Sequence, residues 1–73
     1  NIELHSLTKQ IRDLCDYEER VNILSMLWQI MLADEKLDSL EANLMRRVAG
    51  LLFVSDVDSG IAKRTAKASM GLA

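Results

Sequence analysis

The stretch from Tyr17 to Ala33 constrains the fold of this chain more than any other segment. On a helix, its apolar side chains would occupy most of the circumference. The polar strip that remains consists of four residues, namely Glu18, Asn22, Ser25 and Gln29. A helix that is apolar on most sides is packed on several sides. We therefore predict a central helix here, with the rest of the chain packed around it.

Helix ends in this chain must be set by caps and glycines, because the sequence contains no proline. Three capping boxes are present: Asp16-x-x-Glu19, Asp38-x-x-Glu41 and Ser55-x-x-Asp58. In each box the first side chain can accept from unpaired backbone N–H groups, and the acid three residues later favours the positive end of the helix. No window shows the alternation of a half-buried strand. The sequence predicts an all-α, four-helix bundle-like fold with helices at about 3–14, 17–34, 39–53 and 56–69.

Apolar spacing also predicts which side chains each helix buries. For the first helix these are Leu4, Leu7, Ile11 and Leu14. For the third helix they are Leu40, Leu44, Val48, Leu51 and Leu52, and for the fourth Val57, Ile61, Thr65 and Ala68. Within the central helix, four residues are expected to form the core or an interaction surface, namely Leu24, Leu27, Trp28 and Met31. Gly50 inside the third helix suggests a close approach of another helix.

Apolar packing must stabilise this single domain of 73 residues, because the chain has one cysteine and no Cys/His cluster for zinc. The apolar share of 49% is that of an ordinary globular protein. We expect some of this surface to be buried against a partner, either a second copy or a missing N-terminal half. Residues 1–41 carry nine acidic and four basic side chains, and residues 42–73 carry two and five. These halves should attract one another within a chain or between chains.

Several functional classes are disfavoured by composition. No segment reaches the roughly twenty apolar residues of a membrane span, and the first residues do not form a signal peptide, so we expect a cytoplasmic protein. A net charge of −2 does not indicate a nucleic-acid-binding surface, which is usually basic. Lys63, Arg64 and Lys67 line one face of the fourth helix, which fits a solvated face better than an anion or membrane-surface patch. His5, the single histidine, has no nucleophile at a productive spacing, so we expect no enzyme.

The acidic stretch 34–41 is the strongest candidate for a binding site. Asp34, Asp38 and Glu41 can point toward one small volume from a tight connection between two helices, and hard divalent cations take such oxygen ligands. The spacing differs from that of an EF-hand loop, and Lys36 lies inside the turn. Capping alone explains Asp38 and Glu41, and Asp34 can pair with a nearby basic residue. A structural turn and a divalent-cation site both remain open, and we expect no other cofactor.

Four groups of residues in this chain resemble the tellurite-resistance TerB-like family, in particular its short bacterial members. They are Tyr17-Glu-Glu-Arg20, Leu27-Trp28, Ala33-Asp34-Glu-Lys-Leu37-Asp38-x-x-Glu41 and Leu44-Met-Arg-Arg-Val48-Ala49-x-Leu-Leu52-x-Val54-Ser55. The family signature is a turn of the form Ala-Asp-Gly-x-(Leu/Ile)-x-x-x-Glu between two helices. Residues 33–41 fit this signature at every position but one.

The resemblance implies an all-helical domain with two related halves, of which residues 1–73 would be the C-terminal one. It implies a role in tellurite or other stress resistance, metal binding through acidic residues, and no enzymatic activity. Asp34 and Glu41 match the signature acids, whereas Asp38 is added from its position in the turn. Glu35 stands where the signature has glycine. Either the turn has a different shape here, or this acid adds negative charge to whatever the turn binds.

Overall fold

The computed structural model describes residues 2–33 and 39–72, which form four α-helices. The helices are α1 (Ile2–Leu14), α2 (Tyr17–Ala33), α3 (Ser39–Leu51) and α4 (Asp56–Ser69). The predicted all-α fold is confirmed, since no strand occurs in either described range. Each observed helix end lies within two residues of its predicted position.

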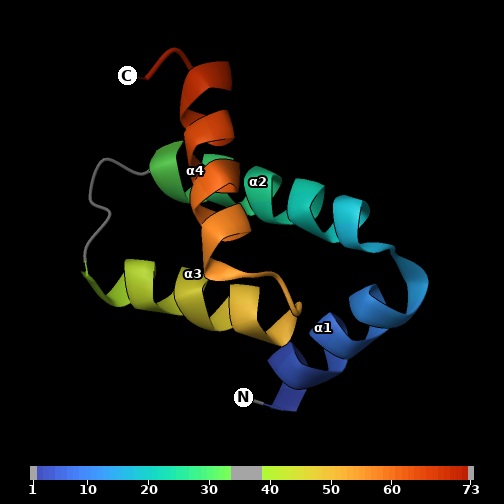
Figure 1. Ribbon diagram of the computed structural model, residues 1–73. Helices are drawn as coiled ribbons and strands as arrows, with labels where there is room; N and C mark the ends of the chain where they lie inside the picture. The colour runs from blue at the N-terminus through green and yellow to red at the C-terminus, as the bar shows by residue number, and fades with distance from the viewer. Residues whose placement is uncertain (1, 34–38, 73) are drawn as a thin grey trace.

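The helices pack around one core in which α2 is central. α2 and α3 run in opposite directions, and α4 crosses α2 steeply and packs more extensively against it than against any other described helix (Figure 1). α1 packs against α3. Leu24 of α2 and Leu52, just after α3, are the largest fully buried side chains. Leu4 and Ile11 of α1 pack against this core from outside.

The predicted capping box at Asp16 is confirmed in full and the one at Ser55 in part, whereas Asp38 of the third box lies outside the described residues. The backbone N–H of Glu19 donates to the carboxylate of Asp16 at 2.8 Å, and the N–H of Asp16 donates back to the carboxylate of Glu19 at 2.9 Å. At α4, the N–H of Asp58 donates to the hydroxyl of Ser55 at 3.1 Å. The hydroxyl of Tyr17 donates to the Asp58 carboxylate and accepts from the Ser55 N–H at 3.3 Å. The first turns of α2 and α4 are therefore joined.

α3 ends at Leu51 rather than at the predicted residue 53, because the chain then turns into a Schellman motif. The N–H of Val54 donates to the carbonyl of Ala49 at 3.0 Å, and the N–H of Phe53 donates to that of Gly50 at 3.1 Å. Phe53 adopts φ 57° in this motif, a conformation that costs a non-glycine residue about 1–2 kcal/mol. Arg12 of α1 braces the motif. Its guanidinium lies 4.4 Å from the centre of the Phe53 ring and donates to the Leu51 carbonyl at 2.7 Å.

The predicted buried face of α4 is wrong. All four residues expected inside are exposed, namely Val57, Ile61, Thr65 and Ala68. The buried residues are instead small, namely Ser59, Ala62 and Ala66. Small side chains let α4 approach α2 closely, and the Ser25 hydroxyl of α2 donates to the Ala62 carbonyl at 3.2 Å. The side of α4 that faces α2 is therefore set by how closely the two helices can approach, rather than by the hydrophobicity of the α4 side chains.

The predicted faces of α1 and α3 are partly wrong. Leu7 and Leu14 are exposed, and Thr8 is buried instead, with its hydroxyl satisfied because it donates to the Leu4 carbonyl at 2.8 Å. In α3, Val48 is buried as predicted, but Leu44 is exposed. The α3 residues that complete the buried face are Met45 and Ala49. The predicted close approach at Gly50 is also wrong, since a Cβ there would meet no atom within 4 Å.

Candidate functional site

The four residues predicted as core or interaction surface lie toward the interior of the fold. Leu24 and Trp28 are buried, with exposed fractions of 0% and 6%. Leu27 and Met31 are partly buried and pack against the core. Removing any of these side chains would therefore act first on folding.

A different face of α2 is left uncovered within the described structure. Ile23, Met26 and Ile30 are spaced three and four residues apart, so they lie on one side of the helix. Met26 is 55% exposed, Ile30 is 67% exposed and Ile23 is half-buried. We call these three residues the α2 stripe. The helical period shows that α2 has more than one apolar face, but only the packing shows which face the other helices leave open.

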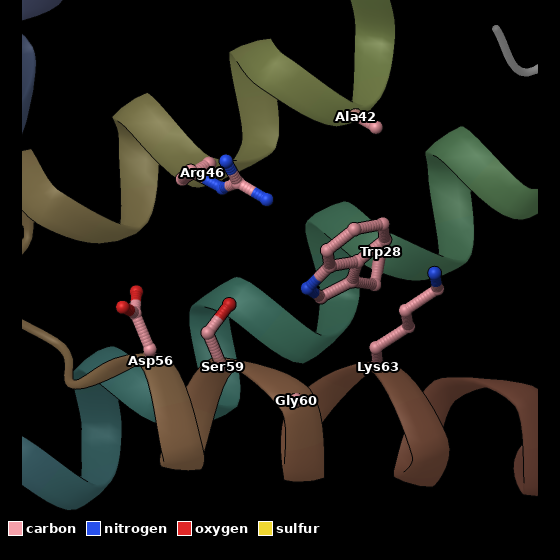
Figure 2. A pocket seen from close by; sticks show the side chains of 7 residues that line it. All are labelled: Trp28, Ala42, Arg46, Asp56, Ser59, Gly60 and Lys63. Carbon is pink, nitrogen blue, oxygen red and sulfur yellow. The ribbon is translucent and has the colours of Figure 1, made fainter. Parts of the chain in front are cut away.

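A second feature is an open cleft of about 430 Å³ between α2, α3 and α4. Figure 2 shows the seven lining residues: Trp28 from α2, Ala42 and Arg46 from α3, and Asp56, Ser59, Gly60 and Lys63 from α4. The Lys63 ammonium lies 5.0 Å from the centre of the Trp28 ring, within reach of a cation–π interaction. We call this space the Trp28 cleft.

Most polar groups of the Trp28 cleft form no hydrogen bond or ion pair with the described residues. The indole Nε1–H of Trp28 is buried and donates to no described acceptor. The lining carries two cationic side chains, Arg46 and Lys63, against one carboxylate, Asp56. Within the described residues, the one ion pair joins Lys9 to Asp13, and neither of these residues lines the cleft. Among the described lining residues, positive charge therefore exceeds negative charge.

The candidate cation ligands cannot be placed beside these features. Asp34 and Asp38 lie outside the described residues, and so does the side chain of Glu41. Elsewhere in the described ranges, no three His, Cys, Asp or Glu side chains gather as metal ligands. The divalent-cation site at 34–41 stays a prediction.

Calorimetric titration with calcium, magnesium, manganese and zinc tests that prediction. We expect a saturable heat for at least one of these ions, because three carboxylates on a tight turn offer oxygen ligands. The double variant Asp34→Asn/Glu41→Gln should lose this heat. Asp13→Asn/Glu18→Gln changes the charge equally at exposed positions and should keep it. Absence of heat at millimolar metal would remove the cation site from consideration.

Comparison with known proteins gives one match. The family model described as tellurite resistance protein TerB matches residues 1–64, which include α1, α2 and α3 entirely. No curated protein and no solved structure matches the chain. Among the described helices, none is both long and apolar enough to cross a membrane.

Proposed function

The chain belongs to the TerB family of tellurite-resistance proteins, and we propose that it acts as a non-enzymatic, cytoplasmic interaction module that self-associates through the α2 stripe. The observation that carries this proposal is the exposure of Met26 and Ile30 on the central helix. Apolar side chains that form a continuous row on a helix are typical of a docking face. A single exposed leucine or valine elsewhere on the surface is ordinary.

The exposed area of the chain supports a partner. Its accessible surface is 5120 Å², whereas a compact folded monomer of this mass exposes about 4500 Å². The excess of roughly 600 Å² approaches the share of about 800 Å² that each partner buries in a standard interface. Further large apolar side chains are more than half exposed, namely Leu7, Leu14, Phe53 and Val57. One partner on the α2 stripe would bury part of this surplus.

A second copy of the chain is the occupant that the symmetry of a helical stripe favours, because the same row of apolar side chains can pack against itself. In a two-fold dimer the same surface meets itself, so two α2 helices would pack antiparallel along their stripes. This arrangement keeps the acidic first turns, with Glu18 and Glu19, away from each other.

Light scattering coupled to size-exclusion chromatography tests self-association. We expect the unaltered chain to run as a dimer at micromolar concentration. Ile30→Glu should convert it to a monomer and raise the dissociation constant by at least about a hundredfold, because a charge would be buried in an apolar interface. The helical circular dichroism should not change, since Ile30 is 67% exposed within one chain.

Val57→Glu is the matched control, because it also places a charge at an exposed apolar position, 72% exposed, but off the α2 stripe. It should leave the dimer intact. An unaltered chain that stays monomeric at high concentration, with a well-dispersed amide spectrum, would contradict self-association. The α2 stripe would then be covered by another segment of a longer chain or by a different protein.

A further inference from the structure

The Trp28 cleft contains a hydrogen-bond donor without an acceptor. Trp28 is 6% exposed, and its Nε1–H reaches no acceptor among the described residues. Buried tryptophans usually pair this group, because an unpaired buried donor loses its hydrogen bond to water without replacement. Figure 2 shows the nitrogen edge of the indole facing the space between Arg46 and Ser59. An acceptor supplied by a ligand would replace that hydrogen bond.

Two further donors face the same space. Arg46 projects into the cleft from α3, and its guanidinium forms no ion pair or hydrogen bond with the described residues (Figure 2). The hydroxyl of Ser59 points into the cleft from α4 (Figure 2). A guanidinium, an indole N–H and a hydroxyl that converge on one volume can all donate to a single oxyanion. Guanidinium in particular matches carboxylate and phosphate with paired N–H groups.

The remaining walls refine the chemistry of the ligand. Lys63 lies against the Trp28 ring and adds positive charge to the cleft. Asp56 contributes a carboxylate from the first turn of α4, which would repel a bare anion but would accept from an ammonium or hydroxyl group. Ala42 carries only a methyl group and Gly60 has no side chain, so both leave space between these groups. The volume of about 430 Å³ lies in the usual range of small-molecule pockets.

We propose that the Trp28 cleft binds a small phosphate monoester that carries an ammonium or hydroxyl group nearby. Its oxyanion accepts from Arg46, Trp28 and Ser59, and its donor group faces Asp56. Lys63 holds the indole ring and adds to the positive potential. The exposed Arg46 side chain turns to admit the ligand oxygen to the Nε1–H.

The single tryptophan makes this proposal directly measurable. One indole N–H resonance appears in a ¹⁵N-correlated spectrum, and it should shift when an oxyanion accepts from it. The probes are O-phosphoethanolamine, inorganic phosphate and ethanolamine. We expect a saturable shift with O-phosphoethanolamine at millimolar concentration, about tenfold weaker binding of inorganic phosphate, and no shift with ethanolamine.

Variants separate a defined site from general charge attraction. Arg46→Gln should weaken binding of O-phosphoethanolamine by at least about tenfold. Arg47→Gln removes the same charge from the adjacent, exposed position, which does not line the cleft, and should leave binding unchanged. Asp56→Asn should abolish the preference for O-phosphoethanolamine over inorganic phosphate.

Two results would overturn the proposal. One is the absence of a saturable shift with either oxyanion, and the other is equal weakening by Arg46→Gln and Arg47→Gln. The α2 stripe and Trp28 lie on different faces of α2. The titration can therefore be repeated on the Ile30→Glu variant, and its outcome does not depend on self-association.

Discussion

Leu24→Ala should lower the free energy of unfolding by about 3 kcal/mol, since truncating a buried leucine typically costs 2–5 kcal/mol. Leu24 has no exposed surface and lies in the core cluster with Trp28 and Leu52. The loss combines the lost transfer of apolar atoms from water with the cavity that they leave. A domain of 73 residues has a total stability of only about 4–11 kcal/mol. This one truncation should therefore leave a substantial unfolded fraction at moderate temperature.

Chemical denaturation, followed by circular dichroism, measures this loss. Protein concentration must be held constant, because binding between copies raises apparent stability. Leu14→Ala is the matched control, since it makes the same truncation at a side chain that is 83% exposed. It should change stability by less than about 0.5 kcal/mol. Equal losses in the two variants would contradict the core described here.

Ala66→Leu should destabilise the fold by about 1–3 kcal/mol through overpacking. Ala66 has no exposed surface and belongs to the row of small side chains that α4 turns inward. A larger side chain there must push α4 away from its neighbours. The hydrogen bond from Ser25 to the Ala62 carbonyl, one turn away, should lengthen or break. Because Trp28 lines the space beside α4, its fluorescence should shift to longer wavelength.

Ala68→Leu serves as the control for Ala66→Leu. It adds the same atoms to the same helix at an exposed position, and alanine and leucine differ little in helix propensity. We expect stability close to that of the unaltered chain and no change in tryptophan fluorescence. A greater loss in Ala68→Leu than in Ala66→Leu would mean that α4 is rotated toward the face predicted from hydrophobicity.

The helices could be predicted from sequence because their signals are local. The boxes at Asp16 and Ser55 place the starts of α2 and α4, and their hydrogen bonds form as expected. Gly71, just after α4, adopts φ 74° in a second Schellman motif, and glycine is the usual residue at that position. A residue at positive φ that is not glycine, as at Phe53, has no comparable sequence signal.

The faces of the helices were harder to predict because burial was inferred from hydrophobicity alone. α4 buries Ala62 and Ala66 while Val57 and Ile61 remain exposed, so side-chain size outweighs apolar character where two backbones come close. Thr8 is buried for a related reason, since its hydroxyl is satisfied within its own helix. Such choices depend on the neighbouring helix, which spacing within one segment does not specify.

The Trp28 cleft could not be predicted from spacing, because its residues come from three helices. The sequence places Lys63 on a basic face of the fourth helix, and the positions of Lys63 and Arg46 in their own helices do not indicate that both lie beside Trp28. The unpaired indole N–H is a property of the packed structure alone. The acidic turn has a strong local sequence pattern, but Asp34 and Asp38 lie outside the described residues, and so does the side chain of Glu41.

The order in which the helices pack has a consequence for the speed of folding. α2 packs chiefly with α4, and α1 packs with α3. The main partners are therefore two helices apart along the chain, rather than adjacent helices. The bonds that join them, from Arg12 to Leu51 and from Ser25 to Ala62, span 39 and 37 residues. Closing two such interleaved loops costs chain entropy before the contacts form. This protein should fold more slowly than a bundle of similar size in which consecutive helices pair.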